Sequence, residues 1–256
     1  FGKWGLGAPG SASDPLACGF DRFFGYNCQR HAHSFYPTWL RDGRERVPLD
    51  NADVPVTASL PSDPPPTAAD FARFRGTVYS ADRIGAEALD FVRAHKDEPF
   101  FLYVPTTLPH VALQVPADEP SLEVHRQRFG AETPYLGGKG YVPCVEPAAT
   151  LAAMITRMDR DVGRIVGLLE ELGIADDTIF VFTSDNGATF PGAGGAATDR
   201  MESHGAFRDW KGSPYEGGLR VPAVVVWPGR IGAGREVEVD RVLRGWPART
   251  LRPRRR

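Results

Sequence analysis

The sequence T-I-F-V-F-T-S-D-N-G, from Thr178 to Gly187, decides the fold class. Its residues 179–182 are apolar and rich in strand formers, which is typical of a strand buried on both faces of a sheet. The run ends at Asp185 and Asn186, and in open α/β sheets ligands bind beyond the carboxyl ends of the strands. Both side chains carry hard oxygen atoms, so they are candidate ligands for a divalent cation such as Ca²⁺ or Mg²⁺. On these residues alone, an Asx-type turn that binds no metal is the favoured interpretation.

Helical and strand patterns alternate around this stretch. Apolar residues recur at helical spacing from about Tyr79 to His95, where Ser80 is a candidate N-cap, and again as a long stripe over residues 151–172. Gly173 is the expected stop of the second helix. Apolar runs at 100–104 and 223–227 predict two further strands. This alternation predicts an α/β fold with a mostly parallel central sheet flanked by helices.

The remaining segments show little periodicity. Residues 1–66 are rich in Gly, Pro and aromatic residues and are expected to form long loops with short strands, while residues 111–146 are expected to form a surface excursion. Residues 241–256 contain seven arginines and no acidic residue. Such a tail can bind phosphate backbones, but out-of-frame translation of a GC-rich gene explains it more simply. We expect it to be disordered or out of frame and separate from the domain over residues 1–240.

Composition excludes several classes of function. The chain of 256 residues is long enough for one large domain, and its net charge of −2 gives no general attraction to nucleic acid or membranes. It contains no apolar run of about 18 residues, so no membrane span is expected. The three cysteines, Cys18, Cys28 and Cys144, form no C-x-x-C pair, which argues against a zinc site. One disulfide with a free thiol and three free thiols both remain open.

Candidate catalytic residues follow the predicted strands or lie in Gly-rich loops. They are Lys3, His110, the Asp185–Asn186 pair and Lys211. Together they would suit an anionic tetrahedral group, because lysines neutralise its charge and a metal polarises its oxygens. A histidine can protonate a leaving oxygen near neutral pH. Taken singly, each lysine could equally be a solvated surface residue, and His110 could cap a turn.

Six stretches of the chain, in order, resemble the sulfatase family, in the arylsulfatase branch of the alkaline-phosphatase-like superfamily. They are G-K-W-G-L-G at Gly2–Gly7, G-F-D-R-F-F-G-Y-N-C-Q-R-H-A-H at Gly19–His33, P-F-F-L-Y-V-P-T-T-L-P-H at Pro99–His110, M-I-T-R-M-D-R-D-V-G at Met154–Gly163, V-F-T-S-D-N-G at Val181–Gly187 and K-G-S-P-Y-E-G-G-L-R-V-P at Lys211–Pro222. The resemblance implies a sulfuric ester hydrolase that uses Ca²⁺ and a formylglycine, made from cysteine or serine, whose hydrate attacks sulfur.

The resemblance also implies a role for each candidate residue. Asp185 and Asn186 would be metal ligands, and Lys3 would contact the formylglycine. Lys211 would hold the sulfate and the leaving oxygen. His110 would lie beside the leaving group as a candidate acid.

The chain departs from the family pattern in two ways. The C-x-P-S-R-type segment that carries the nucleophile, and the strand with paired aspartates that completes the metal site, are expected upstream of Phe1. Residues 1–240 would then be a partial catalytic domain, and this chain alone is expected to be inactive. In addition, Gly5 stands where the family usually has a histidine near the formylglycine.

Alternatives to a sulfatase are a phosphate or phosphonate ester hydrolase of the same superfamily and a non-catalytic remnant of the fold. The expected substrate is a small-molecule or saccharide sulfate ester, whose organic part would contact a loop at residues 20–66 that contains Arg30, His31, His33, Tyr36 and Trp39. The resemblance suggests a periplasmic, secreted or lysosome-like location. The sequence does not indicate an oligomeric state.

Overall fold

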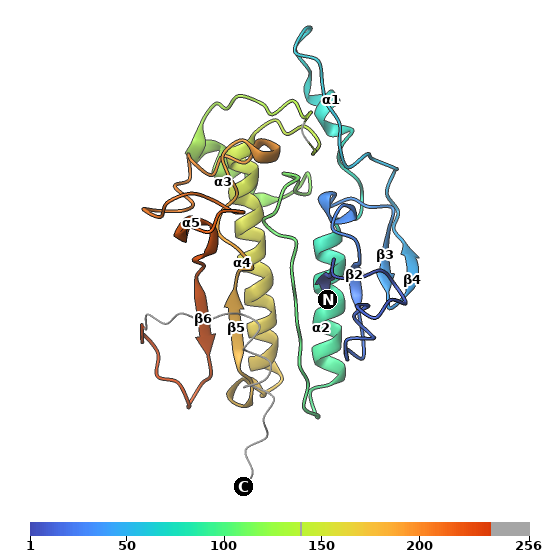
Figure 1. Cartoon of the computed structure of the whole chain (residues 1–256), viewed down its shortest axis with the longest axis vertical. Helices are drawn as coiled ribbons and strands as arrows, with labels where there is room; N and C mark the ends of the chain where they lie inside the picture. The colour runs from blue at the N-terminus through green and yellow to red at the C-terminus, as the bar shows by residue number, and fades with distance from the viewer. Residues whose placement is uncertain (139, 237–256) are drawn as a thin grey trace.

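The computed structural model describes residues 1–138 and 140–236, and its amino-terminal part forms a small mixed sheet (Figure 1). The strand order is β1 (Gly2–Lys3), β2 (Phe24–Tyr26), β3 (Trp39–Asp42) and β4 (Glu45–Pro48). β1 pairs parallel with β2, whereas β2–β3 and β3–β4 are antiparallel. The expectation of short strands among long loops in this region is therefore confirmed.

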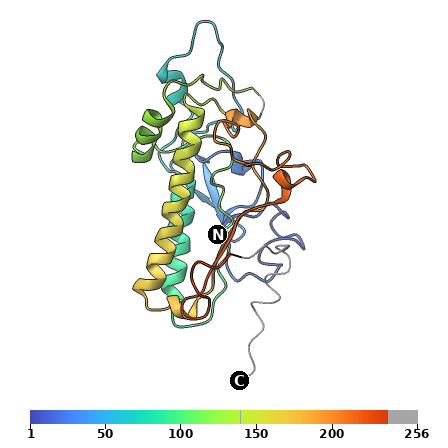
Figure 2. The ribbon, with the colours of Figure 1, turned by 90° about the vertical axis from the view of Figure 1, so that its left-hand side faces the viewer.

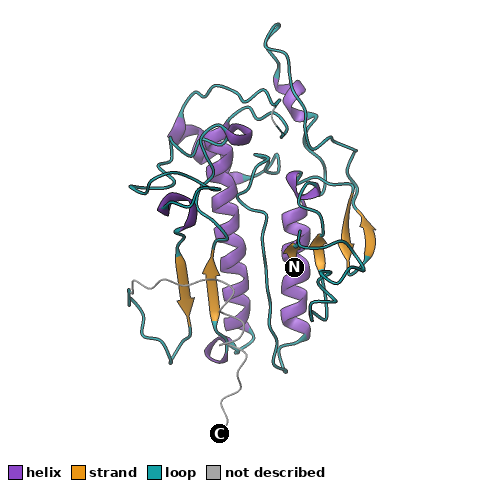
Figure 3. Ribbon diagram, viewed as in Figure 1, coloured by secondary structure: helices purple, strands orange, loops and turns teal. Residues whose placement is uncertain are grey.

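The run at residues 100–104 is extended but is not a strand, which corrects the prediction. The Phe1 amino nitrogen donates to the Tyr103 carbonyl at 2.9 Å and the Lys3 amide donates to the Pro105 carbonyl at 2.8 Å, so the segment lies alongside β1. These bonds fall on one edge only and do not build a continuous ladder. Figure 3 shows this stretch as a loop. Its position still carries the chain from the edge of β1 to His110.

The two later strands are confirmed, but they pair with each other in antiparallel register. β5 (Phe180–Thr183) lies beside β6 (Ala223–Val226), with Phe180 opposite Val226. Among the described strands, only β1 and β2 pair in parallel, so the predicted mostly parallel sheet is not observed in this part of the chain. Burial of β5 on both faces is also wrong, since Phe180 packs against α4 residues while Val181 is 36% exposed. Within the described residues, β6 is the sole strand paired with β5, which leaves the other edge open.

Two long helices lie side by side and support both sheets (Figure 2). They are α2 (Ser80–Ala94) and α4 (Pro147–Glu171), and a cluster containing Leu89, Val92, Leu168 and Leu169 packs between them. Tyr79, not Ser80, is the N-cap of α2. Ser80 is the first residue of the helix and is buried. Gly173 has φ +70° and ends α4 as expected, because glycine adopts this left-handed conformation without strain.

The other helical elements are shorter than α2 and α4. They are α1 (Ala68–Ala72), α3 (Pro120–Phe129), α5 (Glu216–Leu219) and the 3₁₀ turns η1 (His31–His33), η2 (Ala175–Asp177) and η3 (Ala193–Gly195). The α/β fold class, with helices flanking one mixed sheet and one antiparallel pair of strands, is confirmed.

Residues 111–146 are not a surface excursion, which is a second correction. The segment contributes α3 and buried core residues, among them Leu113, Val115, Leu122 and Cys144, to the same cluster as residues of α4. Gln114 fastens it in place, since its Oε1 accepts from the Phe35 amide at 2.9 Å and its Nε2 donates to the Phe74 carbonyl at 2.7 Å. The backbone is irregular, so burial leaves no periodic pattern in the sequence.

Other expectations concern the cysteines, membranes and the tail. Cys18 and Cys28 are exposed free thiols and Cys144 is a buried one, so three thiols is the correct alternative. In the part of the chain that the structure describes, no helix is long and apolar enough to cross a membrane. The arginine-rich segment 241–256 lies outside the described residues.

Candidate functional site

The loop that carries Lys211 is docked directly onto the turn that follows β5. The Gly187 amide donates to the Gly218 carbonyl at 3.0 Å, and the Lys211 amide donates to the Ala188 carbonyl at 2.8 Å. A β-carbon on Gly187 would lie 2.0 Å from the Gly217 oxygen, which no side chain could tolerate. The glycines of S-D-N-G and E-G-G are therefore what allow the two loops to meet.

Lys3 faces these two loops from the end of β1. Burial lowers the pKa of Lys3, while the nearby Asp185 carboxylate raises it and the Lys211 ammonium group lowers it. Asp185 also adds to the effect of burial in raising the pKa of Tyr103, in the segment beside β1. Three predicted residues from distant parts of the chain therefore lie close enough to interact electrostatically.

His110 belongs to the same group. Its Nδ1 is hydrogen-bonded to the Val111 carbonyl, and its pKa falls to about 4, mainly through burial and also through Lys3 and Lys211. The ring is therefore neutral near neutral pH, with the proton on Nδ1 and a lone pair on Nε2. In this resting state His110 is a proton acceptor, so it could act as the predicted acid only after taking up a proton.

Two further aromatic side chains surround His110. The His33 ring stacks on it with centroids 5.5 Å apart and planes at 18°, and the Tyr141 ring lies 4.9 Å from that of His33. Tyr141 was missed because it lies in an irregular segment with no motif of its own. His33 was expected only as one member of a loop.

The other members of that loop do not line the site together. Tyr36 is buried and its hydroxyl donates to the Val115 carbonyl at 3.0 Å. The His31 and Trp39 rings pack against each other with centroids 4.1 Å apart. Tyr36 is therefore a core residue, whereas a role of the half-buried His31 and Trp39 in contacting the substrate stays a prediction.

The space where a side chain at residue 5 would lie is occupied by the Gln29 side chain. Gly5 has φ +69°, and a β-carbon there would lie 2.5 Å from Cγ of Gln29. An imidazole at this position would strain the backbone, because φ is positive, and would require the Gln29 side chain to move.

Asp185 and Asn186 offer the right donor type for Ca²⁺ but only part of a shell. Asp185 is exposed, whereas Asn186 is half-buried and its Nδ2 donates to the Gly187 carbonyl at 2.9 Å. Ca²⁺ takes about six to eight oxygens, and this pair supplies no more than about three. The described residues contain no group of three or more His, Cys, Asp or Glu side chains that could hold a metal.

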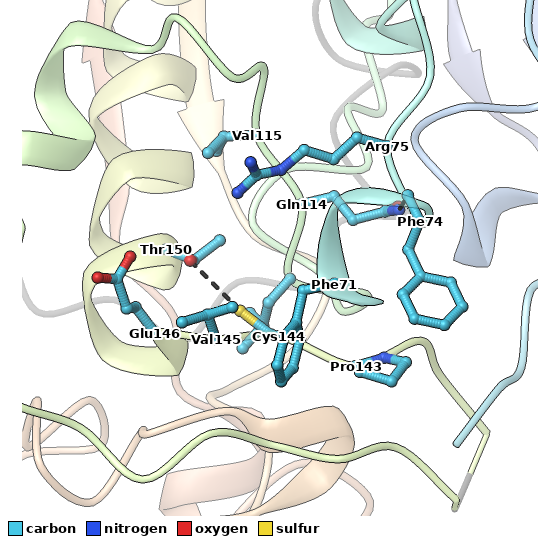
Figure 4. Close-up of a pocket in the computed structure, with 11 residues that line it drawn as sticks. Phe71, Phe74, Arg75, Gln114, Val115, Pro143, Cys144, Val145, Glu146 and Thr150 are labelled. Carbon is cyan, nitrogen blue, oxygen red and sulfur yellow. Dashed lines mark hydrogen bonds between the residues drawn. The ribbon is translucent and has the colours of Figure 1, made fainter. Parts of the chain in front are cut away.

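A small internal cavity lies elsewhere, beside α4 (Figure 4). Its volume is about 30 Å³, enough for about one water molecule, and Phe71, Cys144 and Thr150 are among its lining residues. Cys144 donates a hydrogen bond to Thr150 Oγ1 at 3.3 Å, and burial raises the pKa of its thiol to about 11. None of the candidate site residues lines this cavity, and its protonated thiol is a poor nucleophile.

Comparison with known proteins agrees with the resemblance. An N-acetylgalactosamine-6-O-sulfatase from Bacteroides thetaiotaomicron is 35% identical over 155 residues, which is 59% of this chain and 26% of that protein. The N-acetylgalactosamine-6-sulfatase of Canis lupus familiaris is 30% identical over 247 residues, 91% of this chain and 38% of the relative.

Solved structures agree as well. The crystal structure of Ps i-CgsB in complex with k-i-k-neocarrahexaose superposes with a TM-score of 0.62 at 25% identity, covering 91% of this chain and 45% of that one. PsFucS1 sulfatase from Pseudoalteromonas sp., with a TM-score of 0.55 at 22% identity over 91% of this chain and 43% of its own, shares the fold. The chain thus spans less than half the length of these proteins. Because the sulfatase family model matches residues 1–243, the chain belongs to the sulfatase family.

Proposed function

We propose that residues 1–240 form part of the catalytic domain of a sulfuric ester hydrolase. The observation that carries this proposal is the convergence of Lys3 and Lys211, which lie close enough for Lys211 to lower the pKa of Lys3. Holding two ammonium groups together in a partly buried place costs free energy. The Asp185 carboxylate beside Lys3 offsets part of that cost. An oxyanion bound between the lysines would offset more of it, and a sulfate ester carries the tetrahedral oxyanion that the family requires.

The residues then take distinct roles. Lys211 would hold the sulfate and the leaving oxygen, and Lys3 would contact the formylglycine expected from the family. Asp185 and Asn186 would contribute oxygens to Ca²⁺, which polarises the sulfate oxygens when bound. His110, neutral at rest, would first take up a proton from solvent and then donate it to the leaving oxygen as the bond between that oxygen and sulfur breaks.

The substrate class we propose is a saccharide sulfate ester. This is supported by relatives named N-acetylgalactosamine-6-sulfatase and by a structural neighbour solved with k-i-k-neocarrahexaose. A periplasmic, secreted or lysosome-like location is proposed on family resemblance. One observation favours the non-catalytic alternative, namely that Gln29 fills the space where an imidazole at residue 5 would stand.

Binding and turnover should be measured separately on the 256-residue chain with Ca²⁺ present. The probes are 4-nitrophenyl sulfate and 4-nitrophenyl phosphate. Lys3→Ala and Lys211→Ala are each expected to weaken sulfate binding about ten-fold, which corresponds to about 1.4 kcal/mol. Lys96→Ala, which removes a half-exposed lysine paired with Asp97, is the matched control and should bind normally.

The outcomes separate the three candidate functions. Binding of the sulfate ester that is weakened in both lysine variants supports a sulfatase site even without hydrolysis, because no nucleophile is assigned among residues 1–240. Turnover of the phosphate ester alone would replace the sulfatase by a phosphate ester hydrolase. Failure of the unsubstituted chain to bind either ester would identify a remnant of the fold.

A further inference from the structure

His33 and His31 lie two residues apart on η1 but have different surroundings. The His31 ring packs against Trp39 at 4.1 Å and Tyr26 at 5.2 Å, and its Nδ1 is buried. The His33 ring instead stacks on His110 at 5.5 Å. The turn therefore sends one imidazole into the core and the other to the candidate site.

The His33 ring is held from two sides. His110 stacks on it with planes at 18°, and Tyr141 packs at 4.9 Å and 44°. Tyr141 is itself fixed by its contacts with buried core residues and by the close approach of Gly194. Since no hydrogen bond from the His33 ring to a described residue is found, its nitrogens can bind a ligand without breaking an internal contact.

Three cations act on this ring. Burial lowers the pKa of His33 first, and the positive charges of Lys3, Arg30 and Lys211 lower it further. The groups around His33 are thus the three cations together with the neutral His110 and the Tyr141 ring. An anion among them would counter the cations and favour a protonated imidazole.

We propose that His33 is an ester-binding residue of this site, paired with His110, and that the pair takes up a proton when a sulfate ester binds between Lys3 and Lys211. The inference rests on the proposed function and adds to it a residue that no family role assigns. His33 also supplies the site with a second imidazole beside that of His110. Residue 5 supplies none, because it is a glycine against which Gln29 packs. The ligand chemistry is a monoanionic sulfate ester with oxygens that accept hydrogen bonds from imidazolium.

The first test needs no substitution. Methyl sulfate is titrated into the 256-residue chain while the imidazole ¹⁵N signals are followed by NMR. The His33 and His110 nitrogens are expected to shift toward the protonated form, and those of His31 should stay in place. A shift confined to His110 would overturn the role of His33.

The second test uses matched variants. His33→Phe is expected to weaken methyl sulfate binding about five-fold and to reduce the proton uptake measured by calorimetry in two buffers of different ionisation enthalpy. His31→Phe, on the same turn, should leave both unchanged. His33→Gln serves as a second variant that keeps a polar group, and it should reduce the proton uptake as His33→Phe does even where affinity is partly retained.

The failures of the two proposals are distinguishable. If the unsubstituted chain does not bind methyl sulfate, both the proposed function and this inference fail. If binding is lost in Lys3→Ala but is normal, with normal proton uptake, in both His33 variants, the anion site stands and His33 has no part in it.

Discussion

The carbonyl oxygen of Gly217 rests against Gly187, so closely that a β-carbon at residue 187 would lie 2.0 Å from it. This contact joins the turn after β5 to the loop that carries Lys211. The relative position of Asp185 and Lys211 therefore depends on the absence of a methyl group. The same backbone contact therefore contributes to the packing of the fold and fixes the arrangement of the candidate site.

Gly187→Ala is expected to separate the two loops. The overlap should reduce the free energy of unfolding by about 1–3 kcal/mol and weaken methyl sulfate binding in parallel. Gly163→Ala is the control, because Gly163 is exposed in α4 and a β-carbon there meets nothing within 4 Å. That change should raise the free energy of unfolding by about 0.5–1 kcal/mol. Urea unfolding measures both, and equal stabilities for the two variants would contradict the contact.

Glu119→Gln is expected to destabilise the fold without touching the site. The Glu119 side chain is fully buried and forms ion pairs with Arg157 and Arg160. Burial raises the pKa of Glu119, but hydrogen bonds from Ser121, Arg157 and Arg160 outweigh it and lower the pKa to about 2. Arg157 keeps its ion pair with Asp82, so the loss of the Glu119 charge should cost about 1–3 kcal/mol in urea unfolding. A change below about 1 kcal/mol would show that the network relaxes or is hydrated.

Asp185→Asn is expected to lower the pKa of Lys3 further. The Asp185 carboxylate raises this pKa at present, so removing its charge leaves burial and Lys211 unopposed. The pH dependence of the Lys3 ¹³Cε signal measures the change. Asp176→Asn, at the opposite end of β5 in η2, is the control and should have no effect. An unaltered Lys3 titration in Asp185→Asn would place the two residues too far apart to share a ligand.

His31→Phe is expected to make stability less sensitive to acid. Burial, with Arg46 and Arg41, lowers the pKa of His31 from 6.5 to about 4 in the folded chain. The unfolded chain therefore binds this proton first, so the stabilisation is complete above pH 6.5 and is lost as pH falls toward about 4. Melting temperatures across this range should fall less steeply in His31→Phe. Parallel profiles for the two proteins would exclude His31 as a cause of acid destabilisation.

The parts of the fold that the sequence predicted are those with a regular apolar period. The stripes of α2 and α4 record burial directly, the runs of β5 and β6 mark strands although several of their side chains are exposed, and Gly173 ends α4 as its conformation requires. The direction of the β5–β6 pairing was not predictable in this way. An apolar run predicts that a strand forms, but it does not say which neighbour pairs with the strand.

The sequence predicted which residues belong to the candidate site better than it predicted how they are arranged in space. Lys3, His110, Asp185 and Lys211 were found from motifs, because each motif joins a charged or titratable residue to a turn. Tyr141 gave no such signal, since it reaches the site through the irregular segment that was expected on the surface. The contrast between His31 and His33 depends on which way a 3₁₀ turn faces, and that is set by tertiary packing.

The antiparallel ladder of β5 and β6 has a consequence for local unfolding. The chain between Thr183 and Ala223 runs for about forty residues and includes Lys211, so pairing these strands closes a long loop at an entropic cost. Asp185 follows β5 directly, whereas Lys211 is kept nearby by this loop and by its contacts with the turn. Opening the ladder would release Lys211 from Asp185 while α2 and α4 stay packed. The capacity to bind an anion would therefore disappear in a local transition that leaves most of the helical structure intact.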